Sequence, residues 1–241
     1  DRLLDRTECL SCDGDLAWAA SSWFPSISAD GNTVVFSTSG ANAEAAVDVV
    51  SVLWEEGGTQ RFFPTGATET VGEPELSRDG SVVVFHTRQA FDEVLDTNTT
   101  LDIYAYDVTN SGLRLLSRDL AGAFAGDSDN PSIGSSRWVA FEADASNFGG
   151  IAGRTVVVRC DLSPSVPSCE LVSGSEELLP NGDCLRPSIA NDGLQVAYES
   201  LASNLVTEDE QTSRSIYVWD EGSTTYPSMG FESGGSVACS D

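Results

Sequence analysis

The stretch WFPSISADGNTVVFST, residues 23–38, decides the fold because it returns three more times along the chain. The later copies read EPELSRDGSVVVFHT from Glu73, NPSIGSSRWVAFEA from Asn130 and RPSIANDGLQVAYES from Arg186. Their anchor prolines stand 49, 57 and 56 residues apart, at Pro25, Pro74, Pro131 and Pro187. A period in this range indicates one supersecondary unit that is used repeatedly, as in propellers and arrays.

Each repeat divides into four predicted strands. The first is the short Pro-Ser-Ile type segment, which ends in an Asp-Gly turn at residues 30–31, 79–80 and 192–193; the third repeat has Gly134-Ser135-Ser136 instead. Asp-Gly between two hydrophobic runs is a strong hairpin signal. The second strands read TVVFST, VVVFHT, WVAFEA and QVAYES, the third begin near residues 48, 102, 154 and 215, and the fourth near residues 60, 113, 169 and 224. β-branched and aromatic residues dominate these runs, which predicts an all-β protein.

Four-stranded units repeated in this way are typical of the blades of a β-propeller. The segments PSISADG at Pro25, VAF at Val139 and DIYAYD at Asp102 resemble the TolB-type propeller family with its WD-like repeats, and the match covers residues 23 to about 230. The resemblance implies a β-propeller of four-stranded antiparallel blades and roles that are mostly binding and assembly. It does not imply one activity, because a fold alone does not define a function.

The repeats predict a single propeller domain over residues 1–241. Blades are expected at 23–72, 73–129, 130–185 and 186–230, with a C-terminal tail at 231–241. Residues 1–22 are expected to hold the outer strand of a preceding blade and a linker, because DRLLDR at the start resembles LRLLSR at residues 113–118. This orphan N-terminal strand has three explanations: a longer propeller, a four-bladed ring with a spare strand, or a strand that pairs with a neighbouring molecule.

Charge excludes several classes of partner. The 241 residues include 38 acidic and 12 basic side chains, for a formal net charge of −26. Nucleic-acid binding depends on Lys and Arg, so it is excluded here, and an anionic membrane surface is disfavoured for the same reason. No apolar run approaches the ~20 residues that span a bilayer, so no membrane insertion is expected. The acidic surplus suits cations and a saline or extracellular medium.

Six cysteines indicate an oxidising compartment. Cys160 ends the run RTVVVRC and Cys169 begins CELVS, with a Ser/Pro-rich turn between them, so they are predicted to pair across a hairpin. A disulfide that closes a loop of ~10 residues stabilises by roughly 2–3 kcal/mol in the chain-entropy model. The other four allow three pairings, among which the sequence does not choose: Cys9, Cys12, Cys184 and Cys239. A zinc site that uses Cys9-x-x-Cys12 lacks a second close pair.

The loop DTNTTLD holds the best metal-site candidate, with Asp96, Asn98 and Asp102 as calcium ligands. Oxygen ligands at alternate positions suit Ca²⁺, which takes six to eight of them. The competing interpretation is an ordinary Asx-rich turn that enters the following strand. Asn98-Thr99-Thr100 is also a glycosylation sequon, and a glycan on Asn98 excludes calcium at the same side chain.

Catalytic motifs are absent from the sequence. It contains no G-x-S-x-G elbow, no H-E-x-x-H and no dinucleotide fingerprint, so we expect no enzyme activity. The only histidine, His86, occupies the slot of Ser37, Glu142 and Glu199 in the repeat, which favours a variable strand position over a metal or acid–base role. The acidic cluster Asp127-Ser128-Asp129 is expected to face the central channel.

These observations favour a non-enzymatic extracellular propeller that acts as a structural, assembly or adhesion scaffold. Its partners are then other proteins or copies of itself. The first alternative is a module that recognises a protein or glycan through the loops at residues 92–102 and 208–214. The second is an accessory propeller of a peptidase whose catalytic domain lies outside this chain. A secreted, cell-surface or periplasmic location fits all three, and calcium is the one cofactor that the sequence suggests.

Overall fold

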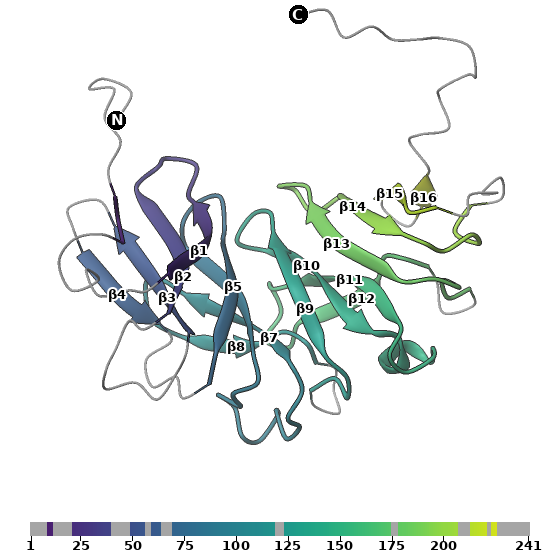
Figure 1. Cartoon of the computed structure of the whole chain (residues 1–241), viewed down its shortest axis with the longest axis horizontal. Helices are drawn as coiled ribbons and strands as arrows, with labels where there is room; N and C mark the ends of the chain where they lie inside the picture. The colour runs from purple at the N-terminus through teal and green to yellow at the C-terminus, as the bar shows by residue number, and fades with distance from the viewer. Residues whose placement is uncertain are drawn as a thin grey trace, which may run out of the picture.

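The computed structural model describes residues 9–11, 21–39, 49–55, 59–63, 69–118, 123–174, 178–206, 213–220 and 223–225. These residues form four antiparallel sheets of four strands each, so the predicted all-β fold of four-stranded blades is confirmed (Figure 1). The described residues contain no α-helix, and no helix among them is long and apolar enough to cross a membrane. The proposed orphan strand at residues 1–6 lies outside the described residues.

The strands follow the sequence runs closely. The first sheet contains β1 (Ser21–Ile27), β2 (Thr33–Ser39), β3 (Val49–Glu55) and β4 (Thr59–Phe63). The second contains β5 (Val71–Leu76), β6 (Val82–Thr87), β7 (Asp102–Asp107) and β8 (Leu113–Leu115). The third contains β9 (Ser128–Ile133), β10 (Trp138–Asp144), β11 (Thr155–Asp161) and β12 (Ser168–Leu171), with a 3₁₀ turn, η2 (Ala145–Phe148), between β10 and β11. The fourth contains β13 (Cys184–Ile189), β14 (Gln195–Ser200), β15 (Ser215–Asp220) and β16 (Ser223–Thr225).

Within each sheet every strand pairs with the next strand in sequence. The sheets stand side by side in chain order (Figure 1). The first strand of each sheet contacts the first strand of the next, β1 with β5, β5 with β9 and β9 with β13, and the second and third strands also contact the first strand of the following sheet. The segments around the four prolines therefore gather along one line, although more than a hundred residues separate the first from the last.

The Asp-Gly turns join the first two strands of three sheets. At the first turn the Asp30 carboxylate accepts hydrogen bonds from the Ser28 hydroxyl (2.6 Å) and the Asn32 amide (3.0 Å). The same pattern recurs at Asp79, which accepts from Ser77 and from the residue after the glycine. Gly31 has a φ of 79°, a left-handed conformation that favours glycine. The repeated Ser-x-Asp-Gly sequence thus encodes the turn directly.

Large side chains of the second and third strands fill the space between sheets. Phe85, Phe141 and Tyr198 occupy equivalent positions and are at most 1% exposed. Phe85 stacks on Tyr104 with ring centroids 6.1 Å apart, and Tyr198 stacks in the same way on Tyr217 at 5.8 Å. These aromatic residues pack between the sheets and are unavailable as a ligand cage.

Arg159 joins the third sheet to the fourth. Its guanidinium lies 4.3 Å from the ring centroids of both Trp138 and Trp219, and its Nε donates to the Glu170 carboxylate at 2.9 Å. The residue is 8% exposed, and it also donates to the carbonyl of Gly193. A cation held between two indole faces is stabilised by both ring quadrupoles.

We expect Arg159→Met to lower the free energy of unfolding by about 2 kcal/mol, because it removes two cation–π contacts and the hydrogen bonds to Glu170 and Gly193. Chemical denaturation followed by tryptophan fluorescence measures this loss. Arg137→Met is the matched control, since Arg137 contacts the same Trp138 but is largely exposed and should cost less. Equal losses in the two variants would contradict the role of Arg159.

The disulfide between Cys160 and Cys169 is present, as predicted, and joins directly paired residues of β11 and β12. Cys9 is also disulfide-bonded, whereas Cys12 and Cys239 lie outside the described residues. Cys184 carries a free, buried thiol that lies 3.2 Å from the Ser200 hydroxyl. Burial raises the pKa of the Cys184 thiol to about 11, so it is an unreactive core group at neutral pH.

Candidate functional site

The residue before each anchor proline has a left-handed backbone. Phe24, Glu73, Asn130 and Arg186 have φ values of 54°, 46°, 47° and 52°. At the same place in every sheet the pairing of the first two strands shifts register, which is a β-bulge. Positive φ at a non-glycine residue is uncommon and tends to occur where a side chain must be aimed at a functional site. Four repetitions of it turn four different side chains toward the same region.

The residue after each proline links its sheet to the next one. Ser26 accepts a hydrogen bond from the Leu76 amide (3.0 Å) and Glu75 accepts one from the Ile133 amide (3.0 Å). In the third sheet Ser132 accepts from the Ile189 amide at 3.3 Å. Burial raises the pKa of Glu75 to about 7. The inner strands are therefore connected by one repeated contact that also fixes the spacing of the bulges.

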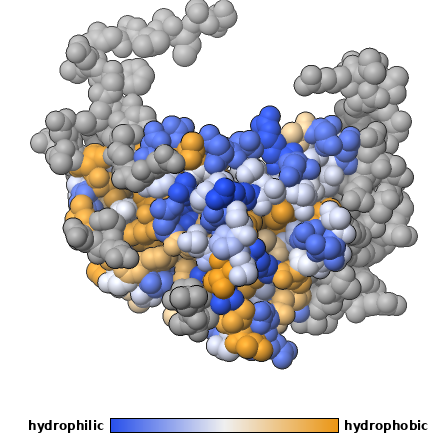
Figure 2. All heavy atoms as spheres, turned by 180° about the vertical axis from the view of Figure 1, so that it is seen from behind, coloured by the Kyte–Doolittle hydropathy of each residue, from blue (hydrophilic) through white to orange (hydrophobic). Residues whose placement is uncertain are grey.

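An open cavity of about 380 Å³ lies among the four bulges. It is lined by the residues that flank the prolines and by the prolines themselves: Phe24, Pro25, Ser26, Glu73, Pro74, Glu75, Asn130, Pro131, Arg186 and Pro187. Apolar, acidic, amide and basic side chains share this lining, so the cavity offers both contact surface and charge. The reverse face of the molecule mixes hydrophilic and hydrophobic side chains (Figure 2).

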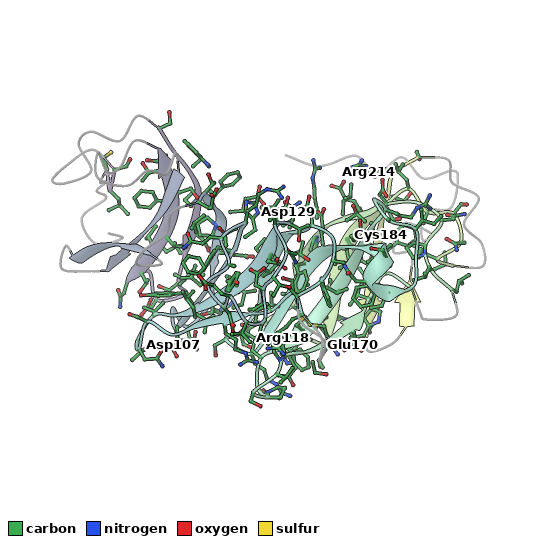
Figure 3. The ribbon with its side chains drawn as sticks, turned by 90° about the horizontal axis from the view of Figure 1, so that it is seen from below. Asp107, Arg118, Asp129, Glu170, Cys184 and Arg214 are labelled. Carbon is green, nitrogen blue, oxygen red and sulfur yellow. A yellow bond between two sulfur atoms is a disulfide. The ribbon has the colours of Figure 1, made fainter. Side chains whose placement is uncertain are left out.

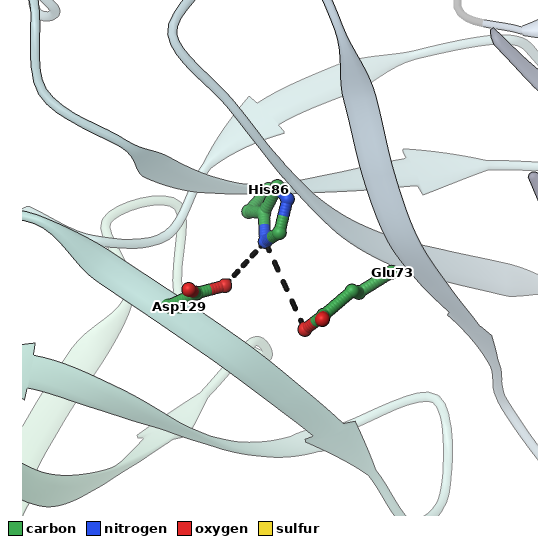
Figure 4. A group of neighbouring side chains, drawn as sticks. All are labelled: Glu73, His86 and Asp129. Carbon is green, nitrogen blue, oxygen red and sulfur yellow. Dashed lines mark hydrogen bonds and ion pairs between the residues drawn. The ribbon is translucent and has the colours of Figure 1, made fainter. Parts of the chain in front are cut away.

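Beside this cavity, His86 connects the second sheet to the third (Figure 4). Its Nδ1 makes a hydrogen bond with the Asp129 carboxylate and lies 3.9 Å from a carboxylate oxygen of Glu73. The equivalent residue of the next sheet, Glu142, is 7% exposed and accepts hydrogen bonds from the Arg186 amide (2.7 Å) and the Asn130 side chain (2.8 Å). In the second and third sheets, the residue at this slot thus reaches the following sheet.

The electrostatics of this cluster are strongly acidic. Burial raises the pKa of Glu73, and the negative charge of Asp129 adds to the rise. Burial likewise raises the pKa of Glu142, with contributions from Asp129 and Glu73. Asp129 has a lowered pKa, despite its burial, because of the hydrogen bond and the charge of His86. One imidazole therefore lies between two carboxyl groups, Glu73 and Asp129, and Glu142 adds a third negative charge near those two.

The sequence identified two of these residues but not their association. Asp129 was expected to face the central channel, and it lies near the middle of the row of sheets (Figure 3). His86 was interpreted as a variable strand position, and its partners in another sheet were missed. The sequence offers one signal for this association: His86 aligns with Glu142 and Glu199, so each of these repeats has a polar residue at the same position of its second strand.

The predicted calcium residues lie on the loop between β6 and β7, and each is engaged within the protein. Asp96 is buried and accepts from the Tyr104 hydroxyl at 2.6 Å. Asp102 is fully buried and accepts from the Ser117 hydroxyl at 2.5 Å, while its Oδ2 makes no hydrogen bond with any described residue. Burial raises the pKa of Asp102 to about 7, and the charges of Asp96 and Asp127 add to this rise.

Asn98 is half-buried, and both the nitrogen and the oxygen of its side-chain amide form hydrogen bonds. Its amide nitrogen donates to the Phe124 carbonyl at 2.7 Å, and its oxygen accepts from the Thr100 amide at 2.8 Å. The oxygen therefore closes an Asx turn, as the competing interpretation of this loop has it. Calcium at Asp96, Asn98 and Asp102 and a glycan at Asn98 both stay predictions.

Solved structures with this arrangement of sheets are β-propellers. TolB from Acinetobacter baumannii matches with a TM-score of 0.54 at 15% identity, over 86% of this chain and 43% of that chain. Puromycin hydrolase matches with a TM-score of 0.51 at 13% identity, over 86% of this chain and 28% of that one. Prolyl oligopeptidase B from Galerina marginata matches with a TM-score of 0.53 at 14% identity, over 86% of this chain and 27% of that one.

The likeness defines the chain as a TolB-like β-propeller in fold. No family model and no curated protein matches the sequence. The chain spans less than half the length of these three solved chains, so their activities and partners do not transfer to it. Function has to be argued from the surfaces of this chain itself.

Proposed function

We propose that this chain is a non-enzymatic, extracellular β-propeller scaffold that assembles with further copies of itself. The observation that carries the proposal is a partly exposed face of the fourth sheet, which we call the leading face and define by Ala197, Ile216 and Val218. Ile216 is 50% exposed. Its counterpart in the second sheet, Ile103, is 0% exposed because the third sheet covers it.

The leading face has the composition of a contact between sheets. In the second sheet the corresponding surface consists of Val84, Ile103 and Ala105, and all three are buried in the cluster shared with the third sheet. Burial of apolar surface contributes roughly 25 cal/mol per Å², so a partly exposed apolar face of this kind favours association. A second copy of the chain offers a propeller sheet as the covering element.

The polar rim of the leading face supports the same role. Glu199 occupies the slot from which His86 and Glu142 reach the following sheet, and it is directly paired with Ile216. It binds Arg186 at 3.2 Å and Arg214 at 2.8 Å. These ion pairs lower the pKa of Glu199 and gather two of the chain's few cations at this edge. An edge with apolar centre and charged rim is the usual anatomy of a protein interface.

The molar mass in solution tests this function, by size exclusion with light scattering on non-reduced protein. We expect a mass above the 25.5 kDa of one chain, increasing with concentration. Ile216→Glu should return the mass to that of one chain, because it places a charge in the contact. Ile151→Glu is the control, since Ile151 is 69% exposed on a loop away from this face. A mass of 25.5 kDa at all concentrations would contradict assembly.

A second candidate is an accessory propeller of a peptidase, which the likeness to prolyl oligopeptidase B supports. In that case the cavity among the four bulges would bind a peptide, and the leading face would not join copies of the chain. A discrete monomer that binds a peptide or glycan saturably would favour this candidate or a recognition module. The extracellular setting rests on the disulfide between Cys160 and Cys169.

A further inference from the structure

Three strands of two sheets bring an imidazole and two carboxylates to one point. Glu73 comes from β5, His86 from β6 and Asp129 from β9 (Figure 4). One ligand atom from each lies within 4.8 Å of the other two. All three side chains are partly buried, and Glu73 also lines the open cavity among the bulges. The cluster is thus both enclosed and reachable from solvent.

The fold holds His86 and Asp129 in place before any ligand arrives. Gly72 faces the imidazole so closely that a Cβ there would lie 2.2 Å from His86 Nε2, so the ring fits only against glycine. This contact turns Nδ1 toward the carboxylates. Asp129 is held by its bond to His86 and by the Asn130 amide, which donates to its Oδ1 at 2.8 Å. Binding of a ligand would therefore cost little side-chain conformational entropy at these two residues.

The charge around this point is predominantly negative. Glu142 lies near enough to both Glu73 and Asp129 that their charges raise its pKa. Arg88 acts on Asp129 through its charge, but its guanidinium forms its ion pair with Asp127, at 3.4 Å. Carboxylates that repel one another in a partly buried setting are stabilised by a bound cation.

We propose that Glu73, His86 and Asp129 bind a divalent first-row transition-metal ion, with zinc as the reference case. His86 Nδ1 and one oxygen of each carboxylate supply three ligands, and water completes the shell. Mixed imidazole and carboxylate donors are the set that Zn²⁺ and its neighbours take, whereas Ca²⁺ and Mg²⁺ prefer oxygen alone. The ion joins the second sheet to the third. This site is independent of the leading face and of assembly.

The single histidine of the chain makes the test direct. NMR spectra of histidine-labelled, EDTA-treated protein contain one imidazole, so a titration with ZnCl₂ in excess MgCl₂ follows His86 alone. We expect its ring signals to change saturably at one equivalent, and isothermal titration calorimetry to give the same stoichiometry. MgCl₂ occupies the general acidic surface without competing for the imidazole. Unchanged ring signals would overturn the proposal without any variant being needed.

Variants separate this site from the acidity of the surface. Glu73→Gln and Asp129→Asn should each weaken zinc binding at least tenfold, because each removes one charged ligand. Asp127→Asn is the matched control: it removes the same charge two residues from Asp129 and should leave the affinity within about twofold. Equal effects of Asp127→Asn and Asp129→Asn would overturn the proposal, and circular dichroism checks that each variant is folded.

Discussion

Phe85→Ala is expected to lower the free energy of unfolding by about 3–5 kcal/mol, the range for removing a fully buried aromatic ring. Phe85 is 0% exposed and contacts two further rings, Tyr104 and Phe91, the latter edge-to-face at 6.5 Å. Tyr104 is held on β7, so the surroundings can fill only part of the space that the ring leaves. Thermal denaturation followed by circular dichroism should show a melting temperature lower by on the order of 10 °C.

Two controls show whether the loss arises from the cavity. Phe85→Leu keeps most of the volume and should cost less than half as much, whereas Val94→Ala changes a side chain that is 85% exposed and should cost almost nothing. A melting temperature that does not change in Phe85→Ala would mean that the ring is not part of the core. Because His86 follows Phe85 on β6, the alanine variant should also weaken zinc binding, a coupling that Val94→Ala lacks.

The fold was predictable because its signals are local and repeated. The Ser-x-Asp-Gly turn, the alternation of the second and third strands and the proline spacing all occur within about 50 residues of one another. The Cys160–Cys169 pair was predictable for the same reason, since its two residues face each other in one hairpin. Repetition let each weak signal confirm the others.

The site was less predictable because its contacts run between sheets. Residues 43 positions apart, His86 and Asp129, meet only after the second sheet packs against the third. The left-handed backbone before each proline also escapes sequence reasoning, because a residue before proline ordinarily adopts an extended conformation. That conformation aims Glu73 at His86, and a β-bulge absorbs the extra residue.

Asp102 predicts an unusual pH dependence of stability. Its pKa rises from the ordinary 3.8 to about 7 in the folded protein, because the carboxyl group is fully buried. Between these two values the folded chain holds a proton that the unfolded chain has released. Unfolding then releases a proton, so stability falls as the pH rises and the loss ends above about pH 7. The pKa of Glu75 is also raised to about 7, so Glu75 further lowers the stability of the fold as the pH rises.

We expect the wild type to be less stable at pH 8 than at pH 5 by about 3 kcal/mol from Asp102 alone, measured by denaturation in EDTA. Asp102→Asn keeps the shape and an acceptor for Ser117 but removes the charge, so it should flatten this part of the profile and be more stable than wild type at pH 8. Glu93→Gln, an exposed change on the preceding loop, should leave the profile as it is. Two results together would contradict this prediction: a wild type that is more stable at pH 8 than at pH 5, and an Asp102→Asn variant with the same pH profile as the wild type. They would show that the Asp102 carboxylate is solvated.

The same variant tests the predicted calcium loop. A bound ion that meets the unpaired Oδ2 of Asp102 would offset the cost of its charge, so CaCl₂ at pH 8 should stabilise the wild type and make its pH profile flatter. Asp102→Asn should not respond, because it lacks the charge that the ion would bind. If CaCl₂ stabilises both proteins equally, calcium acts on the general acidic surface and the loop at residues 96–102 is an Asx turn alone. In that case, only the protonated form of Asp102 would be compatible with full stability of the fold.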